Sequence, residues 1–382
     1  MARDMETADF VVIGAGIAGA SVAYELSRHG KVIVLEAESS PGYHSTGRSA
    51  AIMSENYGSA LWSTLVTASR GFLDSPPDGF SDVPLTQPRG AMFLACEGEE
   101  DKLSEQAACM ARRAARFELM TARQALSHCP IIRADLFTQA LHEPDCKDID
   151  TNALLSGYLR ALRAAGGKLF TNATVQSLKR ENGLWLATTT LGSFSAPVVV
   201  NAAGGWAQHV AGMAGLPHRS VNPYRRTAIL IDPPAGGDAS RWPMTFDVAE
   251  TFYFKPEAGR IMVSPVDKEL SVPCDAQADE MEVAIAVDRM ERFTTMQIGR
   301  IEHKWGGLRT FAPDNEPVIG ADPDAEGFIW LAGQGGNGVM AGPASARLAA
   351  HCAVGLSIPQ DIAGLGLTYG AVSPGRSCVR GS

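Results

Sequence analysis

The chain has 382 residues, of which 45% are hydrophobic and 20% are charged, so it can bury a large core and is long enough for two domains. Its 33 basic and 42 acidic side chains give a formal net charge of -9 at pH 7, which excludes an extended basic face for nucleic acid. No apolar run reaches the roughly 20 residues that a membrane span requires.

Cysteine usage and the N-terminus indicate a cytoplasmic protein. The seven cysteines are scattered and form no CxxC pair, which is typical of reduced thiols and predicts neither a disulfide framework nor a metal site. The first ten residues, MARDMETADF, carry three acidic side chains and no apolar run. We therefore expect no signal peptide.

The first elements predict a βαβ unit. Asp9 to Ile13 is a short apolar run, Ile17 to Arg28 is rich in helix formers, and Lys31 to Leu35 is β-branched. Strands joined in this way are parallel and buried.

A glycine motif lies where the first strand turns into the helix. Gly14 permits the tight turn, Gly16 lets the backbone approach a pyrophosphate, and Gly19 lets the helix pack on the strand. Glu36, at the end of the second strand, would accept ribose hydroxyls and repel a 2′-phosphate. The motif therefore predicts a dinucleotide site at the helix N-terminus.

Further along the chain, Asp150 and Thr151 can cap a helix that ends at Gly166 and is followed by a strand at Lys168 to Phe170. Two more strands run into glycine turns: Ser195 to Val200 before NAAGGW, and Phe328 to Ala332 before GQGGNG, after which Gly342 to Ala350 is helical. Three such turns predict one sheet assembled from separated segments.

Two regions, 85–143 and 223–300, differ in character from the rest of the chain. The second has alternating strand-like runs at Thr227 to Ile231, Thr251 to Phe254 and Arg260 to Val263, which are typical of an antiparallel sheet. We expect an α/β fold with a Rossmann-like nucleotide domain built from discontinuous segments and a second, substrate domain. The expected divisions are nucleotide domain 1–84, 144–222 and 301–370; substrate domain 85–143 and 223–300; loosely held tail 371–382.

The additional glycine turns favour a flavin over a nicotinamide cofactor, because a flavin must be held along its full length by several segments. Ser45, Thr46, Arg48 and Ser49 offer donors to the pyrophosphate and the ring edge. The loop from Gly333 to Gly338 can aim amides at the N1/O2 edge, where negative charge gathers on reduction.

Several motifs together resemble the FAD-dependent D-amino acid oxidase superfamily, and within it the bacterial D-arginine dehydrogenase group. They are VVIGAGIAGAS, PGYHSTGRSAA, DIDTNAL, VVNAAGGW, FYFKPEAG, WGGLRTFAPDNEPVIG and AGQGGNG. The resemblance implies non-covalent FAD contacts at Gly14, Gly16, Ala18, Gly19, Glu36, Ala37, Ser45, Thr46, Gly47, Arg48, Ser49, Ala50, Ala51, Ile52, Val175, Gly335, Gly336, Asn337, Gly338, Val339 and Met340.

The resemblance also implies a substrate site in which Arg226, Tyr253 and Arg309 grip a carboxylate and Tyr57 closes over the substrate. Two guanidiniums and a phenol suit a carboxylate, because a bidentate arginine fixes both its position and its plane. Two alternatives stay open: Arg225 competes with Arg226, and the facing of Tyr253 on its strand is uncertain by one residue. The expected substrate pocket comprises Ile52, Gly90, Met244, Phe246, Gly336, Asn337, Gly338 and Val339.

The chain departs from the arginine-specific group at two positions. Gly90 stands where that group has a glutamate for the cationic substrate tail, and Ile52 stands where it has a histidine near the reacting amine. An unpaired buried cation is costly, so a neutral substrate side chain is expected. Ile52, Met244, Phe246 and Met340 can line an apolar pocket, or they are ordinary core.

We therefore expect a D-amino acid dehydrogenase or oxidase. A hydride would pass from Cα to flavin N5, and the imino acid would hydrolyse to a 2-oxo acid and ammonia. An N-alkyl glycine or a 2-hydroxy acid is the alternative substrate on the same scaffold, and a non-catalytic flavin-binding subunit is the alternative of another class. The electron acceptor is left open between oxygen, a quinone and another carrier.

Overall fold

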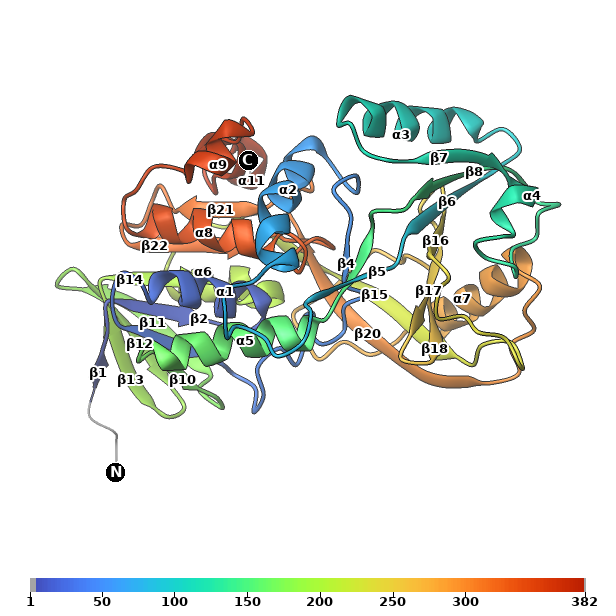
Figure 1. Cartoon of the computed structure of the whole chain (residues 1–382). Coiled ribbons are helices and arrows are strands. Elements are labelled where there is room, and N and C mark those ends of the chain that lie inside the picture. Colours follow the sequence, from blue (N-terminus) through green and yellow to red (C-terminus); the bar gives the residue numbers. More distant parts are fainter. Residues whose placement is uncertain (1–4, 381–382) are drawn as a thin grey trace.

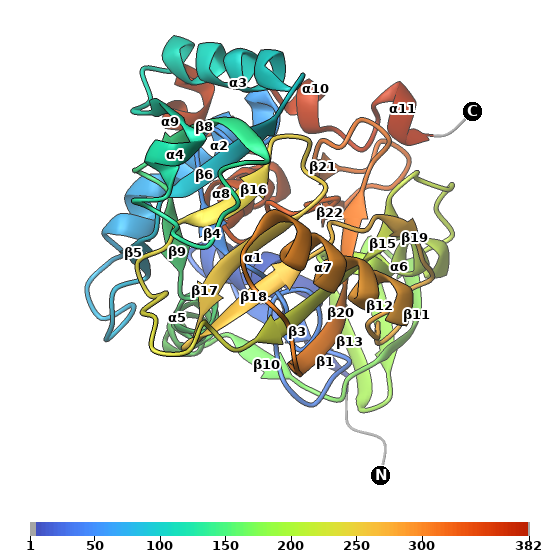
Figure 2. The same ribbon diagram turned by 90° about the vertical axis from the view of Figure 1, so that its right-hand side faces the viewer.

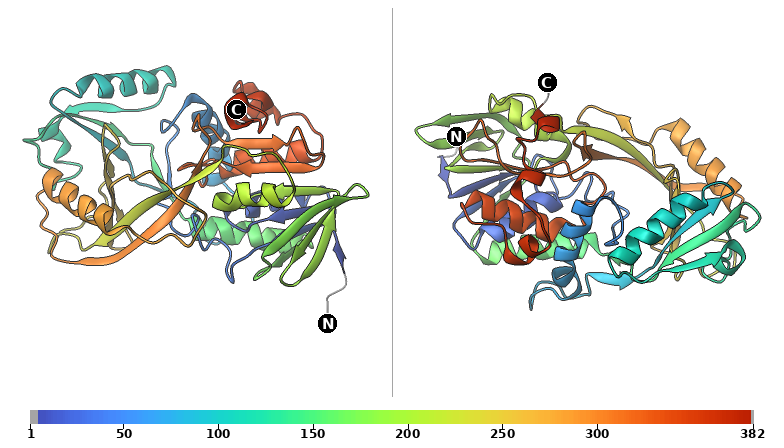
Figure 3. Two further views of the ribbon diagram at one scale, coloured as in Figure 1. Left: turned by 180° about the vertical axis from the view of Figure 1, so that it is seen from behind. Right: turned by 90° about the horizontal axis from the view of Figure 1, so that it is seen from above.

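The computed structural model describes residues 5–380, which form two lobes (Figure 1). One lobe, here the parallel-sheet lobe, is built around a six-stranded sheet and a smaller four-stranded sheet. The other, here the nine-stranded lobe, is built around a nine-stranded sheet. The views from behind and from above in Figure 3 show the two lobes side by side, joined at the middle of the molecule.

The six-stranded sheet confirms the predicted α/β fold class. Its order is β10 (Lys168–Phe170), β3 (Val32–Leu35), β2 (Phe10–Ile13), β14 (Val198–Asn201), β22 (Phe328–Ala332) and β21 (Val318–Ala321). All neighbours are parallel except β21, which is antiparallel to β22. The three strands that run into glycine turns, β2, β14 and β22, are adjacent, as one sheet built from separated segments requires.

Each face of this sheet has its own core, because successive side chains of a strand point to opposite faces. Phe10 and Val12 pack with the helices, whereas Val11 and Ile13 pack with the four-stranded sheet. The helices on the first face are α1 (Ile17–Leu26), α2 (Ala60–Asp74), α5 (Thr151–Ala164) and α8 (Gly342–Ala353). The second face carries α6 (Ala207–Met213) and the sheet β1 (Glu6–Thr7), β13 (Gly192–Ala196), β12 (Leu184–Thr189), β11 (Val175–Glu181).

Local signals set two boundaries here. The Asp150 side chain accepts the Ala153 amide at 2.8 Å and caps α5, as predicted. The single strand expected from Ser195 to Val200 is wrong: it is two strands, β13 in the four-stranded sheet and β14 in the six-stranded sheet. Pro197 lies between them and has no amide proton to donate to either ladder.

The nine-stranded lobe joins the two inserted segments in one sheet, because β6 pairs in parallel with β16. Helix α7 packs on β15 and β18 (Figure 2), and α3 packs on β6 and β8. The strands in order are β19 (Glu269–Leu270), β15 (Asn222–Ile231), β18 (Arg260–Ser264), β17 (Tyr253–Glu257), β16 (Met244–Asp247), β6 (Ala91–Cys96), β8 (Phe137–Glu143) and β7 (Glu118–Thr121), with β20 (Ile301–Phe311) beside β15. The remaining elements are α3 (Glu100–Arg112), α4 (Ala122–Ala125), α7 (Glu280–Phe293) and a small sheet of β4 (Ile52–Met53), β9 (Lys147–Ile149) and β5 (Thr86–Pro88).

The boundary expected at residue 301 is wrong. Strand β20 pairs with β15 from Ile301 to Phe311, so the second lobe extends to Phe311. The sequence did not reveal this pairing, because β15 and β20 are far apart along the chain and the other strands of the second inserted segment lie between them.

The expected loosely held tail, 371–382, is also wrong over its described part. Helices α9 (Gln360–Gly364), α10 (Tyr369–Val372) and α11 (Ser377–Arg380) pack on the parallel-sheet lobe. Val372 and Val379 are fully buried, and the Arg376 Nε lies 3.0 Å from an Asp314 carboxylate oxygen. Residues 381 and 382 lie outside the described part of the chain.

All seven cysteines are free of disulfide bonds. Within residues 5–380, no helix has both the length and the apolar character needed to cross a membrane.

The packing of the tail predicts a stability effect. Val379→Ala should lower the free energy of unfolding by about 2 kcal/mol, because it removes buried methyl groups and leaves a cavity. The matched control Val272→Ala, at a side chain that is 72% exposed, should change it by less than about 0.5 kcal/mol. Urea unfolding of both variants measures the difference, and equal stabilities would mean that the tail is loose.

Candidate active site

A cavity of about 510 Å³ lies between the two lobes and receives all three glycine turns. Its walls include residues that follow β2, β14 and β22, the neighbouring parallel strands whose carboxyl ends meet at one edge of the sheet. The facing wall comes from the nine-stranded lobe and includes Arg226, Tyr253 and Arg309. The site is therefore shared between the lobes.

The first glycine turn has little room for side chains. Gly14 has φ +100°, and a Cβ there would lie 2.6 Å from the Ala202 carbonyl oxygen. The Glu36 carboxylate accepts the Ala15 amide at 2.6 Å and the Glu38 amide at 2.9 Å, which fixes it at the end of β3. Among the described residues, no carbonyl accepts the Gly16 amide at the start of α1. The turn thus offers an anion a free donor at a helix N-terminus.

Hydrogen bonds from the segment after β3 connect the two lobes. Thr46 Oγ1 accepts the Ile17 amide at 3.0 Å, and the Ser45 hydroxyl donates to the Leu308 carbonyl of β20 at 2.5 Å. Arg48 lines the cavity, but its guanidinium donates to the carbonyls of Ala276 and Gly306. The expectation that Arg48 donates to the pyrophosphate is therefore not supported, because its side chain is already engaged by the second lobe.

The third glycine turn, residues 333–338, leaves polar atoms without partners. Gln334 Nε2 and Asn337 Oδ1 are buried and have no hydrogen bond within residues 5–380. A Cβ on Gly336 would lie 2.8 Å from an Arg309 nitrogen, so the loop passes close to that arginine. Buried polar atoms are normally satisfied, so Gln334 Nε2, whose residue lines the cavity, indicates a bound polar group.

The arginines of the expected carboxylate clamp lie on neighbouring strands. Arg226 of β15 pairs with Gly307 of β20, and Arg309 is two residues further along β20, so both side chains lie on one face. Arg225, the alternative to Arg226 in the sequence, lies on the opposite face of the strand, with its guanidinium 2.8 Å from a Glu269 oxygen. Only Arg226, of these two, lines the cavity.

Tyr253 lies on the cavity side of β17. Its neighbours Phe252 and Phe254 pack in a different core cluster, as strand alternation requires. The facing that the sequence left open is therefore the one that brings Tyr253 to Arg226 and Arg309.

The two guanidiniums have few counter-charges. Burial and the neighbouring Arg309 lower the pKa of Arg226 to about 10. Arg226 Nε donates to the Asp267 backbone carbonyl at 2.6 Å, whereas the nearest Asp267 carboxylate oxygen is 4.0 Å away and that carboxylate accepts from the amide and hydroxyl of Thr227. The Arg309 side chain has no hydrogen bond or ion pair with any residue between 5 and 380. An anion between the two arginines would supply the missing charge.

An aromatic group lies beside this pair. The ring centroid of Phe246 is 6.1 Å from that of Tyr57 and 5.6 Å from that of Tyr253. Burial, and then the charge of Glu250, raise the pKa of Tyr57 to about 12, so its phenol stays protonated at neutral pH. Met244 packs in the same apolar cluster as Phe246, and Ile52 borders it.

Gly90, which was expected in the substrate pocket, is not among the residues that line the cavity, and neither are Tyr57, Ile52, Met244 and Phe246. A Cβ at Gly90 would lie 2.9 Å from His142 Nε2, so the position faces a histidine of the nine-stranded sheet. The resemblance alone could not reveal this orientation.

The comparisons with known proteins agree with this geometry. A model of the FAD dependent oxidoreductase (DAO) family matches residues 9–352, most of the chain. The chain belongs to the FAD dependent oxidoreductase (DAO) family. It is similar to glycine oxidase of Bacillus subtilis, with 23% identity over 365 residues, 92% of this chain and 94% of that protein.

Two solved structures share the fold. Glycine oxidase from Geobacillus kaustophilus superposes with a TM-score of 0.82 at 22% identity, over 95% of this chain and 99% of that one. Iminodiacetate oxidase from Chelativorans sp. BNC1 superposes with a TM-score of 0.80 at 23% identity, over 96% of this chain and 98% of that one. Membership of the family makes the chain an FAD-dependent oxidoreductase.

The cavity of this family member fits FAD. The glycine turn with its free amide, the anchored Glu36 and the unpaired Gln334 Nε2 match a pyrophosphate, a ribose and a ring edge respectively. Expected FAD residues that line the cavity are Gly14, Gly16, Ala18, Glu36, Ala37, Ser45, Thr46, Arg48, Ser49, Val175, Gly335, Gly336, Gly338 and Val339. Those outside the described lining are Gly19, Gly47, Ala50, Ala51, Ile52, Asn337 and Met340.

Sequence reasoning missed several residues near this site. Trp206 and His209 line the cavity, and the NAAGGW turn that carries Trp206 was the signal that pointed to them. Glu250, at an exposed turn before β17, had no such signal. Burial and then Asp247 raise the pKa of Glu250, whereas Arg226 and the Tyr57 hydroxyl lower it, so this carboxylate lies within reach of the clamp.

The first glycine turn predicts a test of cofactor retention. Gly14→Ala should lose most of its FAD, because the new Cβ meets the Ala202 carbonyl and alanine is strained at φ +100°. The ratio of flavin to protein absorbance after gel filtration measures the loss. Gly71→Ala, in helix α2 with open space around it, is the control and should keep its FAD. Full FAD occupancy in Gly14→Ala would contradict the assignment.

The lowered pKa of Arg226 predicts a pH dependence. A carboxylate without an amine, such as benzoate, should bind with a constant Kd below about pH 9. Its Kd should rise by up to about tenfold per pH unit above 10, since the cationic form of Arg226 is present below its pKa and lost above it. Perturbation of the flavin spectrum follows the titration. Arg226→Ala should bind more weakly and lack the rise, whereas Arg225→Ala should keep the wild-type profile.

Proposed function

We propose that this enzyme oxidises an α-amino acid, and that its preferred substrates are neutral D-amino acids. The observation that carries the proposal is the pair Arg226 and Arg309, which share one wall of the FAD cavity without a carboxylate between them. A substrate carboxylate would supply the charge that this wall lacks. The glycine oxidase and iminodiacetate oxidase relatives act, by their names, on compounds that have such a carboxylate beside an amine.

The neighbourhood of the clamp favours a neutral side chain. Phe246, Tyr57 and Met244 form apolar surface beside Tyr253, and Gly90 provides no carboxylate for a cationic tail. Glu250 is a carboxylate within reach, but it is exposed at a turn and interacts with Arg226 and Tyr57. A buried guanidinium or ammonium tail would therefore be unpaired, at a cost of several kcal/mol.

The chain's own residues orient the substrate and exclude water. Arg226 and Arg309 hold the carboxylate, and the phenols of Tyr253 and Tyr57 donate to it or cover it. Bound FAD supplies the two-electron oxidant that takes a hydride from Cα. The loss of that hydride and of a proton leaves an imino acid, which water hydrolyses to a 2-oxo acid and ammonia.

An N-alkyl glycine is the second candidate. The iminodiacetate oxidase similarity favours it, since iminodiacetate is glycine with a substituent on nitrogen. The same arginines would hold its carboxylate, so the clamp cannot distinguish the two. A 2-hydroxy acid is disfavoured because oxidation of a hydroxyl needs a base near Cα, and Ile52 stands where related enzymes have a histidine.

Anaerobic mixing of the purified FAD enzyme with a substrate panel tests the proposal. The panel contains D- and L-forms of alanine, leucine and methionine, D-arginine, glycine, N-methylglycine and matching 2-hydroxy acids. We expect bleaching of the flavin by the neutral D-amino acids. D-arginine should react with a kred/Kd lower by roughly 100-fold, which corresponds to about 3 kcal/mol.

Two arginine variants test the clamp in the same assay. Arg309→Ala should lower kred/Kd by roughly 100-fold, because Arg226 is then left to hold the carboxylate alone. Arg225→Ala, whose side chain lies on the opposite face, should stay within about threefold of the wild type. Turnover of N-methylglycine alone would favour the second candidate. An oxidised flavin with the whole panel would overturn the proposal and favour a non-catalytic flavin-binding subunit.

A further inference from the structure

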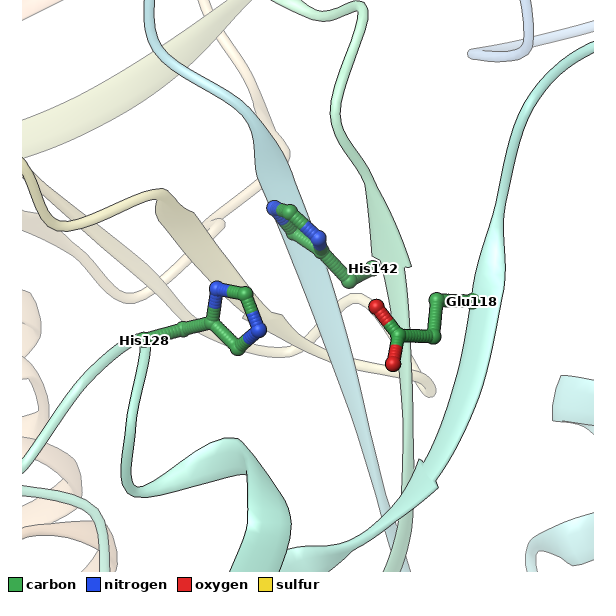
Figure 4. A group of neighbouring side chains, drawn as sticks. All are labelled: Glu118, His128 and His142. Carbon is green, nitrogen blue, oxygen red and sulfur yellow. The ribbon is translucent and has the colours of Figure 1, made fainter.

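A cluster of two histidines and a glutamate lies in the nine-stranded lobe, outside the FAD cavity. Glu118 is on β7, His142 on β8 and His128 on the turn after α4 (Figure 4). One carboxylate oxygen and one ring nitrogen from each histidine all lie within 4.8 Å of one another. None of the three residues lines the FAD cavity, and the site described above makes no use of them.

The sheet brings these side chains together. Glu118 and His142 are direct partners in the antiparallel β7–β8 pair, so they lie on the same face. The ring centroid of His128 is 4.3 Å from that of His142, with the ring planes inclined by 37°. Three segments of the chain therefore point one ligand each at a common point, as Figure 4 shows.

The ligand atoms are not used elsewhere. Within residues 5–380, no side chain of the three makes a hydrogen bond or an ion pair. Two imidazoles and one carboxylate that face one another without a hydrogen-bond partner are ligand types that a metal ion can use.

The donor types select the ion. Imidazole nitrogens suit zinc and its transition-metal neighbours, whereas magnesium and calcium prefer an all-oxygen shell. Ligands about 2.0–2.1 Å from a tetrahedral zinc lie roughly 3.3 Å apart, so the three atoms need to approach by about 1 Å or less each. Three protein ligands leave the fourth position to water.

We propose that Glu118, His128 and His142 form a binding site for a divalent transition-metal ion of the zinc class. The ion ties β7, the edge strand of the nine-stranded sheet, and the turn after α4 to the interior strand β8. Its role is structural, because the site is separate from the residues that line the FAD cavity.

Metal titration of the FAD-bound enzyme, dialysed against a chelator at neutral pH, tests the site. Equilibrium dialysis should find one Zn²⁺ bound through the cluster, and bound Co²⁺ should give visible d–d absorption. Zn²⁺ at about 100 times its Kd should raise Tm by roughly 3 °C. Binding should weaken as pH falls through about 6, since protons then compete for the histidines.

Variants connect the binding to these residues. Glu118→Gln, at an exposed side chain, should keep the fold and weaken Zn²⁺ binding by roughly 100-fold, and His128→Ala should do the same, because each removes one of three ligands. His303→Ala and Cys378→Ser, which remove exposed metal-binding side chains elsewhere, are the matched controls and should bind like the wild type. FAD retention verifies the fold of each variant.

Either of two results would overturn the proposal. One is the absence of any bound Zn²⁺ or Co²⁺ in the wild type at micromolar concentrations. The other is a bound ion whose affinity and stoichiometry are the same in Glu118→Gln and His128→Ala. Neither result bears on substrate oxidation, which the flavin assay measures independently.

Discussion

The candidate active site depends on keeping two guanidinium groups together without an acid between them. Arg226 and Arg309 repel each other, and this repulsion adds to burial in lowering the pKa of Arg226. The antiparallel pairing of β15 with β20 opposes this repulsion, because the backbone hydrogen bonds fix the positions of the Arg226 and Arg309 Cα atoms. Asp267 is the nearby acid, but its carboxylate accepts from Thr227 and it is its backbone carbonyl that accepts from Arg226. The unfavourable charge is thus maintained by the sheet and is available to attract an anion.

The same strand also connects the clamp to the cofactor wall. Its carbonyls at Gly306 and Leu308 accept from Arg48 and Ser45, and its Thr310 carbonyl accepts the Gly335 amide at 2.8 Å. Both cofactor-binding loops are therefore hydrogen bonded to the strand that carries Arg309. In an enzyme that reacts by positioning Cα against a flavin, this continuity matters because small displacements of the carboxylate change the approach of the hydrogen. The lobes are coupled at the point where their relative position affects the chemistry.

The sequence predicted what local chemistry controls. The βαβ unit, the glycine turns and the Asp150 cap follow from contacts between near neighbours, and all three are present in the fold. The choice between Arg225 and Arg226 was beyond the sequence, because it depends on a register with a strand some 80 residues away. The engagement of Arg48 by the second lobe and the direction of Gly90 are long-range in the same way. The tail was misjudged because its composition is typical of loops, although its few apolar residues are buried.

The groups around the clamp also constrain how the amine loses its proton. The titratable groups beside Arg226, apart from Arg309 and Asp267, are Tyr57, Tyr253 and Glu250. Tyr57, with a pKa of about 12, holds its proton at neutral pH and so can donate a hydrogen bond but cannot accept a proton from an ammonium group. Burial and Asp247 raise the pKa of Glu250, whereas the positive charge of Arg226 lowers it and so favours the carboxylate form. A substrate whose amine is already neutral when it binds needs neither Tyr57 nor Glu250 to accept a proton, since the clamp requires only the carboxylate to be charged. For the amino acid substrates proposed above, the arrangement would favour binding of the minor form with a neutral amine and would link turnover to the pKa of the substrate amine.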